Sequence, residues 1–165
     1  MSRFVLGLVG IVGIGLGLLT GANGVSAPQQ SAPSSSVQYV DGGAALKERA
    51  YSPAVVTRGG RIIWLAGQTT TVDLNGKSIA GDFLSQARTD FALIDRTLKR
   101  SGGSLQNLVT MTVFINDPRN GDPFVKLRRE MFPDGKFPAS ALITVSGLAQ
   151  PGMLVEIQGV AVIAN

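Results

Sequence analysis

The chain has 165 residues, 44% of them hydrophobic and 16% charged, which is enough for one domain with a core and an appendage. It contains no cysteine and no histidine, and this excludes disulfides, thiolate nucleophiles, Ser-His-Asp triads and nearly every transition-metal site. The net charge of +4 comes from scattered basic residues, and two tyrosines and one tryptophan offer little for base stacking, so nucleic acid is not an expected partner.

Residues 1–27 have the pattern of a secretory signal peptide. One basic residue, Arg3, precedes a long apolar run, and small residues follow, with candidate cleavage points after Ala22, Gly24 or Ala27. An uncleaved membrane anchor is the alternative, because the apolar run approaches the ~20 residues that span a bilayer. Both readings predict an exported domain, either periplasmic or secreted, or else held at the membrane by this segment.

Residues 28–45 are rich in serine, proline and glutamine and lack an apolar period. This composition predicts a flexible linker. The folded domain is therefore expected over residues 46–165.

The domain begins with two β-branched runs, at residues 55–58 and 61–66, separated by Gly59-Gly60. Adjacent glycines tolerate the positive φ angles of a tight turn, so the pattern predicts a two-stranded hairpin. A second turn is expected at Asn75-Gly76.

A helix is predicted from an N-cap at Asp82 through Arg100. Its apolar positions recur every three or four residues and form one stripe: Phe83, Ala87, Phe91, Ile94 and Leu98. Gly102-Gly103 end the helix.

Residues 109–115 alternate strictly, which predicts a strand with Met111 and Val113 on one face and Thr112 and Phe114 on the other. A loop of turn residues follows. A short helix is then expected at residues 124–132, and two closing strands at residues 141–145 and 154–163.

The elements located in the sequence follow the order β-β-α-β-α-β-β, which is five strands and two helices. We expect an α/β fold with a mixed six-stranded sheet and both helices on one face. Two helices can cover only one face of such a sheet, and the other face is partly apolar. We therefore expect the uncovered face to be buried against further copies of the chain.

Several segments, in order and spacing, resemble the RidA family, also called YjgF or L-PSP proteins. They are Tyr51-Ser-Pro-Ala54, Ala66-Gly-Gln68, Gly81-Asp82, Val113-Phe-Ile-Asn-Asp117, Phe137-Pro-Ala139 and Leu154-Val-Glu-Ile-Gln158. The likeness covers residues 51–163. It implies a chorismate-mutase-like fold and a homotrimer built around a central barrel, with small-molecule clefts between the subunits.

The resemblance also implies hydrolysis of reactive enamines and imines to keto compounds and ammonia, with no cofactor and no metal. In the deaminases of this family an arginine grips the substrate carboxylate and a held water attacks the imine carbon. Here Ser140 stands where that arginine is expected. A hydroxyl donates one neutral hydrogen bond, whereas the arginine makes a charged, bidentate contact with the carboxylate. The chain therefore looks more like the arginine-lacking branches of the family.

The resemblance assigns roles to further residues. Glu156 matches the acid that positions the hydrolytic water, although simple alternation would also place an edge-strand glutamate in solvent. Tyr51, Gly67, Gln68 and Ser140 match residues that line the family cleft. Arg128 or Arg129 could replace the missing arginine, and a solvated helix face is the alternative for both.

Three classes of function remain at this point. The first is an exported cofactor-free deaminase, and the second is a non-catalytic module that binds a small metabolite, such as an imino or keto compound. The third, a ribonuclease as attributed to some relatives, is disfavoured because a basic and aromatic surface is missing.

Overall fold

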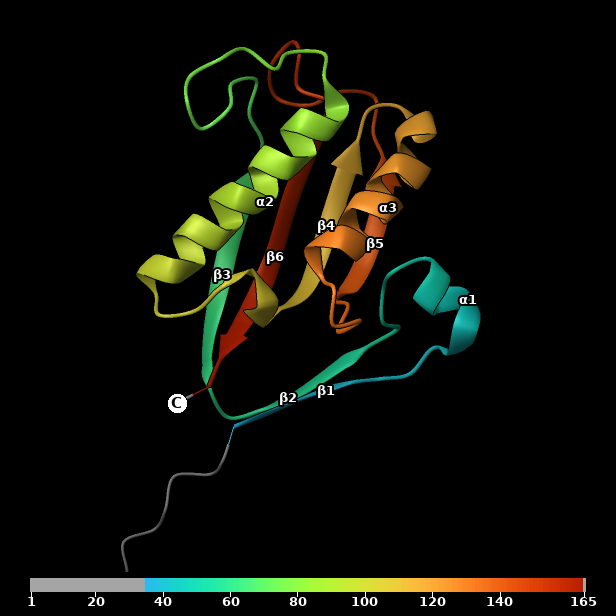
Figure 1. The fold of residues 1–165 in the computed structure, drawn as a ribbon, viewed down its shortest axis with the longest axis vertical. Helices are drawn as coiled ribbons and strands as arrows, with labels where there is room; N and C mark the ends of the chain where they lie inside the picture. The colour runs from blue at the N-terminus through green and yellow to red at the C-terminus, as the bar shows by residue number, and fades with distance from the viewer. Residues whose placement is uncertain (1–34, 165) are drawn as a thin grey trace, which may run out of the picture. The chain divides into compact units, whose positions relative to one another are not determined.

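The computed structural model describes residues 35–164, and the predicted signal segment lies outside them. The main sheet has four strands in the order β3, β6, β4, β5, with antiparallel pairing except for the parallel pair β4–β5. The strands are β3 (Arg61–Gln68), β4 (Leu108–Ile115), β5 (Ala139–Thr144) and β6 (Val155–Ile163). Two helices, α2 (Phe83–Arg100) and α3 (Gly121–Met131), lie over one face (Figure 1). The α/β fold with helices on a mixed sheet is confirmed.

Helix α2 forms as the sequence predicts. The side chain of Asp82 accepts a hydrogen bond of 3.1 Å from the backbone N–H of Ser85, which caps the helix. The whole predicted stripe is buried against the sheet. Gln86 joins this face and fastens the loop before β6, because its Nε2 donates to the Gly152 carbonyl at 2.7 Å and its Oε1 accepts from the Leu154 N–H at 2.9 Å.

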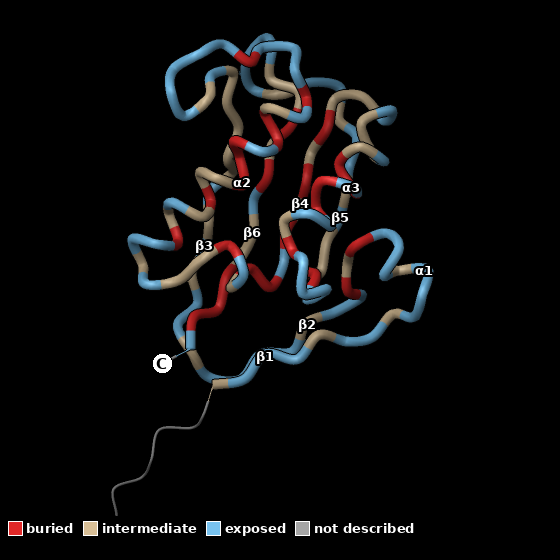
Figure 2. Tube along the Cα trace, viewed as in Figure 1, coloured by how far each residue is buried: buried red, intermediate tan, exposed pale blue. Residues whose placement is uncertain are grey.

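Strand β4 has the two faces that its alternation predicts. Met111, Val113 and Ile115 are buried beneath the helices, whereas Thr110 is exposed on the opposite face. Figure 2 marks the buried residues along α2, α3, β4 and β6. Helix α3 begins at residue 121, three residues earlier than predicted, since Pro123 is tolerated within a first helical turn.

The predicted hairpin between residues 55–58 and 61–66 is wrong. Strand β2 (Val55–Arg58) instead pairs antiparallel with β1 (Ser36–Tyr39), with Ser36 opposite Arg58. Gly59 and Gly60 do have positive φ angles of 60° and 81°. They carry the chain out of the ribbon and past the end of β6, where a Cβ on Gly60 would lie 2.8 Å from the Ile163 carbonyl oxygen. The six strands of residues 35–164 are thus divided between a four-stranded sheet and a two-stranded ribbon.

Part of the predicted linker is also structured. Strand β1 and the start of α1 (Gly43–Glu48) fall within residues 28–45. Backbone hydrogen bonds hold the two strands of the ribbon together, and most of their side chains are exposed. Because neither face of the ribbon has to be apolar, the sequence shows no apolar period there, and the strand could not be predicted from it. Among residues 35–164, none of the helices combines the length and the apolar character needed to cross a bilayer.

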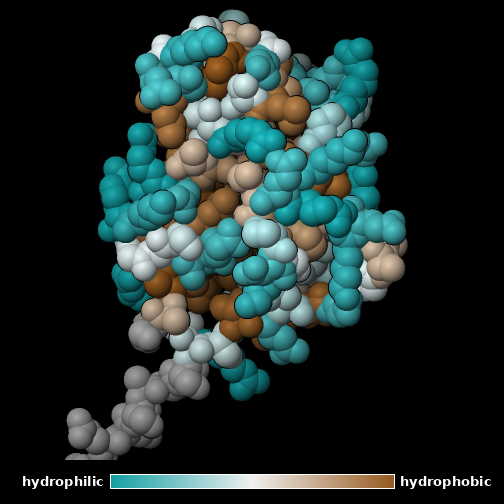
Figure 3. Space-filling model, in the orientation of Figure 1, coloured by the Kyte–Doolittle hydropathy of each residue, from teal (hydrophilic) through white to brown (hydrophobic). Residues whose placement is uncertain are grey.

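The face of the sheet away from the helices, which we call the open face, remains uncovered in the single chain. It exposes Ile62, Trp64 and Ile143. On the helix side, by contrast, hydrophilic side chains predominate over the outer surface of α2 and α3 (Figure 3).

Candidate functional site

Glu156 lies on the open face, near the start of β6. It stands opposite Phe114 of β4 and is half-buried, and its neighbours Val155 and Ile157 are buried on the helix side. A Cβ built on Gly67 would lie 1.9 Å from Oε1 of Glu156. The carboxylate therefore occupies the space that any side chain at position 67 would fill, and the fold brings Gly67 and Glu156 together.

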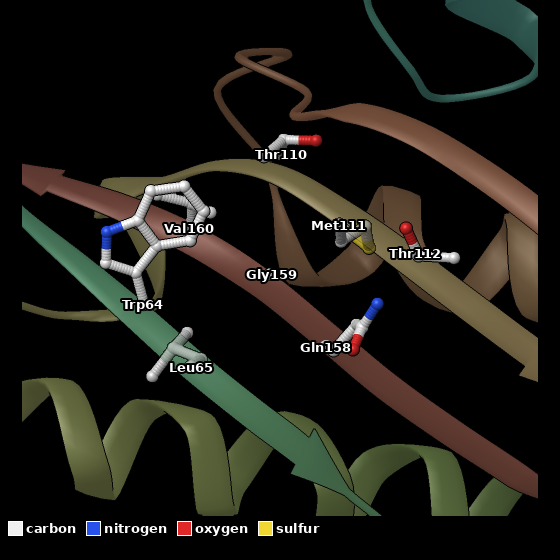
Figure 4. Close-up of a pocket in the computed structure, with 8 residues that line it drawn as sticks. All are labelled: Trp64, Leu65, Thr110, Met111, Thr112, Gln158, Gly159 and Val160. Carbon is white, nitrogen blue, oxygen red and sulfur yellow. The ribbon is translucent and has the colours of Figure 1, made fainter.

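A hollow of about 190 Å³ lies farther along the open face, between β3, β6 and β4. Trp64 stands at its edge beside Val160 of β6, while Thr112 and Gln158 line it from the neighbouring strands (Figure 4). The Trp64 side chain is 79% exposed. A tryptophan this exposed on an apolar sheet face is typical of a surface that a partner covers.

Arg128 belongs to a second cluster, at the junction of α3, β5 and the segment after α1. It lies four residues after Phe124 on the buried face of α3 and is only 2% exposed. Its Nη1 donates to the Ser140 hydroxyl at 2.5 Å, and its Nη2 donates to the Arg49 carbonyl at 2.7 Å. The expectation of a solvated helix face is therefore wrong for Arg128, because its position within the apolar repeat turns it inward.

Aromatic rings lie over the same guanidinium. Its central carbon is 5.8 Å from the centre of the Tyr51 ring and 5.5 Å from that of Phe124. Burial, and then repulsion from Arg49, lowers the pKa of Arg128 to about 10. Arg128 still carries a charge at neutral pH in this environment.

Two other residues from the sequence analysis, Arg129 and Gln68, donate hydrogen bonds to backbone carbonyls. Arg129 is exposed and donates to the Glu48 carbonyl. Gln68 donates to the carbonyls of Ala66 and Gly67 at the bulged end of β3. Its amide therefore secures the local backbone.

Ser140 and Glu156 do not meet within one chain. Ser140 pairs with Met111, and Glu156 pairs with Phe114, three residues farther along β4. Because the two partner positions on β4 are an odd number of residues apart, Ser140 and Glu156 lie on opposite faces of the sheet. Three residues also correspond to roughly 10 Å along the strand. The Arg128 cluster, which consists of Arg128, Ser140 and Tyr51, is thus separate from the Glu156 site of a single copy.

The model for the family Endoribonuclease L-PSP matches residues 43–163. The 3-aminoacrylate deaminase RutC of Acinetobacter baylyi is 30% identical over 111 residues, which cover 67% of this chain and 85% of the relative. A RutC family protein of Pyrococcus horikoshii is 29% identical over 111 residues, with 67% and 85% covered. The chain belongs to the RidA/YjgF (L-PSP) family.

Solved structures of RidA/YjgF proteins agree with this assignment. The Rid family protein YyfB of Yersinia pestis has a TM-score of 0.68 at 22% identity, covering 77% of this chain and 98% of its own. YyfA, from the same organism, has a TM-score of 0.58 at 26% identity, covering 78% and 100%. The first likeness shows the shared fold.

One unusual carboxylate of this RidA/YjgF protein was missed at the sequence level. Asp90 of α2 is completely buried, and neither of its carboxylate oxygens has a hydrogen-bond partner. Burial, and next the charge of Glu156, raises the pKa of Asp90 to about 8. The signal was present, since Asp90 lies three residues after Ala87 and four before Ile94, within the apolar stripe.

Proposed function

We propose that this chain assembles as a RidA-type homotrimer with small-molecule clefts between its copies, and that it hydrolyses enamines and imines to keto compounds and ammonia. The observation that carries the proposal is that Glu156 lies on the same open face as the exposed Trp64. A second copy that covers this face also shields the carboxylate from bulk water.

Burying the open face also supplies the driving force for assembly. Ile62 and Trp64 are 56% and 79% exposed on β3, and Ile143 adds apolar surface on β5. Surfaces of this kind release water when they meet another apolar surface. Assembly through the open face thereby creates a sheltered crevice beside Glu156.

Glu156 supplies the general base in the proposed reaction. Its carboxylate accepts a proton from a water molecule as the water oxygen attacks the carbon of the C=N bond. That proton passes to the nitrogen, which gives a neutral carbinolamine. As the carbinolamine collapses, its hydroxyl proton also passes to the nitrogen, and ammonia leaves. An enamine, which has no C=N bond, first tautomerises to its imine. One water is consumed, a C=O bond replaces the C=N bond, and no oxidation or reduction takes place.

A non-catalytic binding module is the second candidate. Ser140 replaces the arginine of the deaminases, and its hydroxyl is already engaged by Arg128. A cleft with this arrangement could retain a metabolite without turning it over.

Ammonia release from a panel of enamines and imines generated in solution distinguishes the two functions. Replacing Glu156 by Gln removes the base and should lower the rate by about 100-fold or more. Glu48→Gln is the matched control, because Glu48 is an exposed acid at the end of α1, and it should leave the rate unchanged. If the native protein releases no ammonia while a keto acid still raises its melting temperature, the binding module is the correct function.

A further inference from the structure

The fold gathers basic residues from distant parts of the sequence at one end of the main sheet, where β3 begins and β6 ends (Figure 1). Arg61 opens β3 opposite Ile163, and its Nη2 donates to the Ser101 carbonyl at the end of α2 at 2.7 Å. Arg58 ends β2, across the glycine turn from Arg61. Five exposed side chains, which we call the basic end, are found here: Arg58, Arg61, Arg96, Lys99 and Arg100.

The basic end has little opposing negative charge. The segments that meet there contain no aspartate or glutamate: residues 35–38, 55–63, 96–108 and 159–164. Among the ion pairs of residues 35–164, only the one between Lys99 and Asp95, at 2.7 Å, includes a member of the basic end. The guanidinium groups of this end therefore produce a positive potential over it.

The opposite end of the sheet carries charges of both signs. The loops there contain three acids and two cations: Asp73, Asp82, Asp117, Lys77 and Arg119. Arg119 also pairs with Asp117, which cancels part of the positive charge. A negatively charged surface therefore attracts the basic end of the domain more strongly than the opposite end, and this difference orients the domain on such a surface.

The N-terminal part of the chain joins the domain at the basic end. Ser36, the first residue of β1, is paired with Arg58. The apolar run of the sequence covers residues 4–19, and the 16 residues 20–35 connect it to β1. A chain of that length spans at most about 55 Å. When the apolar run enters a bilayer, the basic end is therefore the part of the domain that the chain holds closest to the lipid.

Anionic lipid fits the basic end better than nucleic acid does. The turns between its cations consist of Gly59-Gly60 and Ser101-Gly102-Gly103, which provide no aromatic ring for a base to stack on. An anionic bilayer requires only positive charge, since each Lys or Arg near its surface strengthens binding by roughly fivefold.

We infer that the basic end is a docking surface for a bilayer that carries anionic phospholipid. The exposed cations of β2, β3 and α2 contact the lipid phosphates, and the N-terminal apolar run supplies a second, hydrophobic attachment. Because the two attachments belong to one chain, each raises the effective concentration of the other at the membrane. The inference concerns where the domain is held and does not depend on turnover at Glu156.

The test compares how the full chain partitions into vesicles of phosphatidylcholine alone and into vesicles with about 30% phosphatidylglycerol. The apolar run inserts into both kinds of vesicle, so the ratio of the two partition coefficients isolates the electrostatic contribution. At low ionic strength this ratio should be about 100 or more for the native protein, and it should fall toward 1 in about 0.5 M sodium chloride. Arg58→Gln combined with Arg100→Gln should lower the ratio by roughly 25-fold.

Lys77→Gln combined with Lys126→Gln is the matched control. It also removes two exposed cations that belong to none of the ion pairs of residues 35–164, but away from the basic end, and it should keep the native ratio. An equal fall in the control shows that only net charge matters and overturns the inference, as does a native ratio near 1. Tighter binding to poly(U) RNA than to the anionic vesicles, at equal phosphate concentration, assigns the basic end to nucleic acid and also overturns it.

Discussion

Asp90 should make the stability of this protein depend on pH in an unusual direction. Its carboxyl is completely buried with no hydrogen-bond partner, and its pKa is raised from 3.8 to about 8 by burial and by Glu156. The folded chain therefore keeps the Asp90 proton up to about pH 8, whereas the unfolded chain releases it near pH 4. Because the folded state binds more protons between these values, stability falls as the pH rises through this window.

The magnitude follows from the two pKa values. Each unit of difference corresponds to about 1.4 kcal/mol, so Asp90 lowers the free energy of unfolding by about 2 kcal/mol at pH 5 and about 4 kcal/mol at pH 7. Asp90→Asn cannot ionise and lacks this dependence. The native protein should thus lose about 1.4 kcal/mol per pH unit relative to the variant between pH 5 and pH 7, and the difference should level off above about pH 8.

Urea unfolding of both proteins at several pH values in this range gives the free energy of unfolding as a function of pH. The difference between the two slopes is the quantity to compare, because the cost of burying an amide at position 90 shifts the whole curve of the variant and leaves its slope unchanged. Asp134→Asn, at an exposed loop position, is the control and should keep the native slope. Glu156→Gln removes the second cause of the raised pKa and should move the upper end of the window to lower pH. Parallel curves for the native protein and Asp90→Asn would refute the reasoning.

Two further predictions concern the open face. Trp64→Asp should leave the fold of the single chain intact but shift sedimentation toward monomer, since covering an exposed tryptophan of roughly 200 Å² contributes about 5 kcal/mol per copy. Trp64→Phe should remain assembled, and an unchanged sedimentation profile for Trp64→Asp would exclude this face from the interface. Gly67→Ala should change the free energy of unfolding by less than about 1 kcal/mol, because the new Cβ displaces only the flexible end of Glu156. It should nevertheless lower ammonia release nearly as far as Glu156→Gln does, and retained activity would show that the position of this carboxylate does not matter.

The amino-acid sequence by itself determined the elements whose signals are local. The stripe from Phe83 to Leu98 and the alternation around Met111 specified α2, β4 and their buried faces, because the period of an element is a property of its own residues. The likeness to RidA proteins and the replacement of their arginine by Ser140 were visible for the same reason.

Tertiary structure alone decided what depends on distant partners. Residues 55–58 have the same strand pattern whichever partner they take, and only the folded chain pairs them with β1. The periodicity of α2 and α3 was sufficient to predict that Asp90 and Arg128 point inward. Only the folded chain shows that the Asp90 carboxyl has no hydrogen-bond partner. Only the folded chain, likewise, shows that the Arg128 guanidinium donates to Ser140 and to the Arg49 carbonyl. Proton affinity and unpaired charge depend on what surrounds a group in space, and residues remote in sequence supply those surroundings.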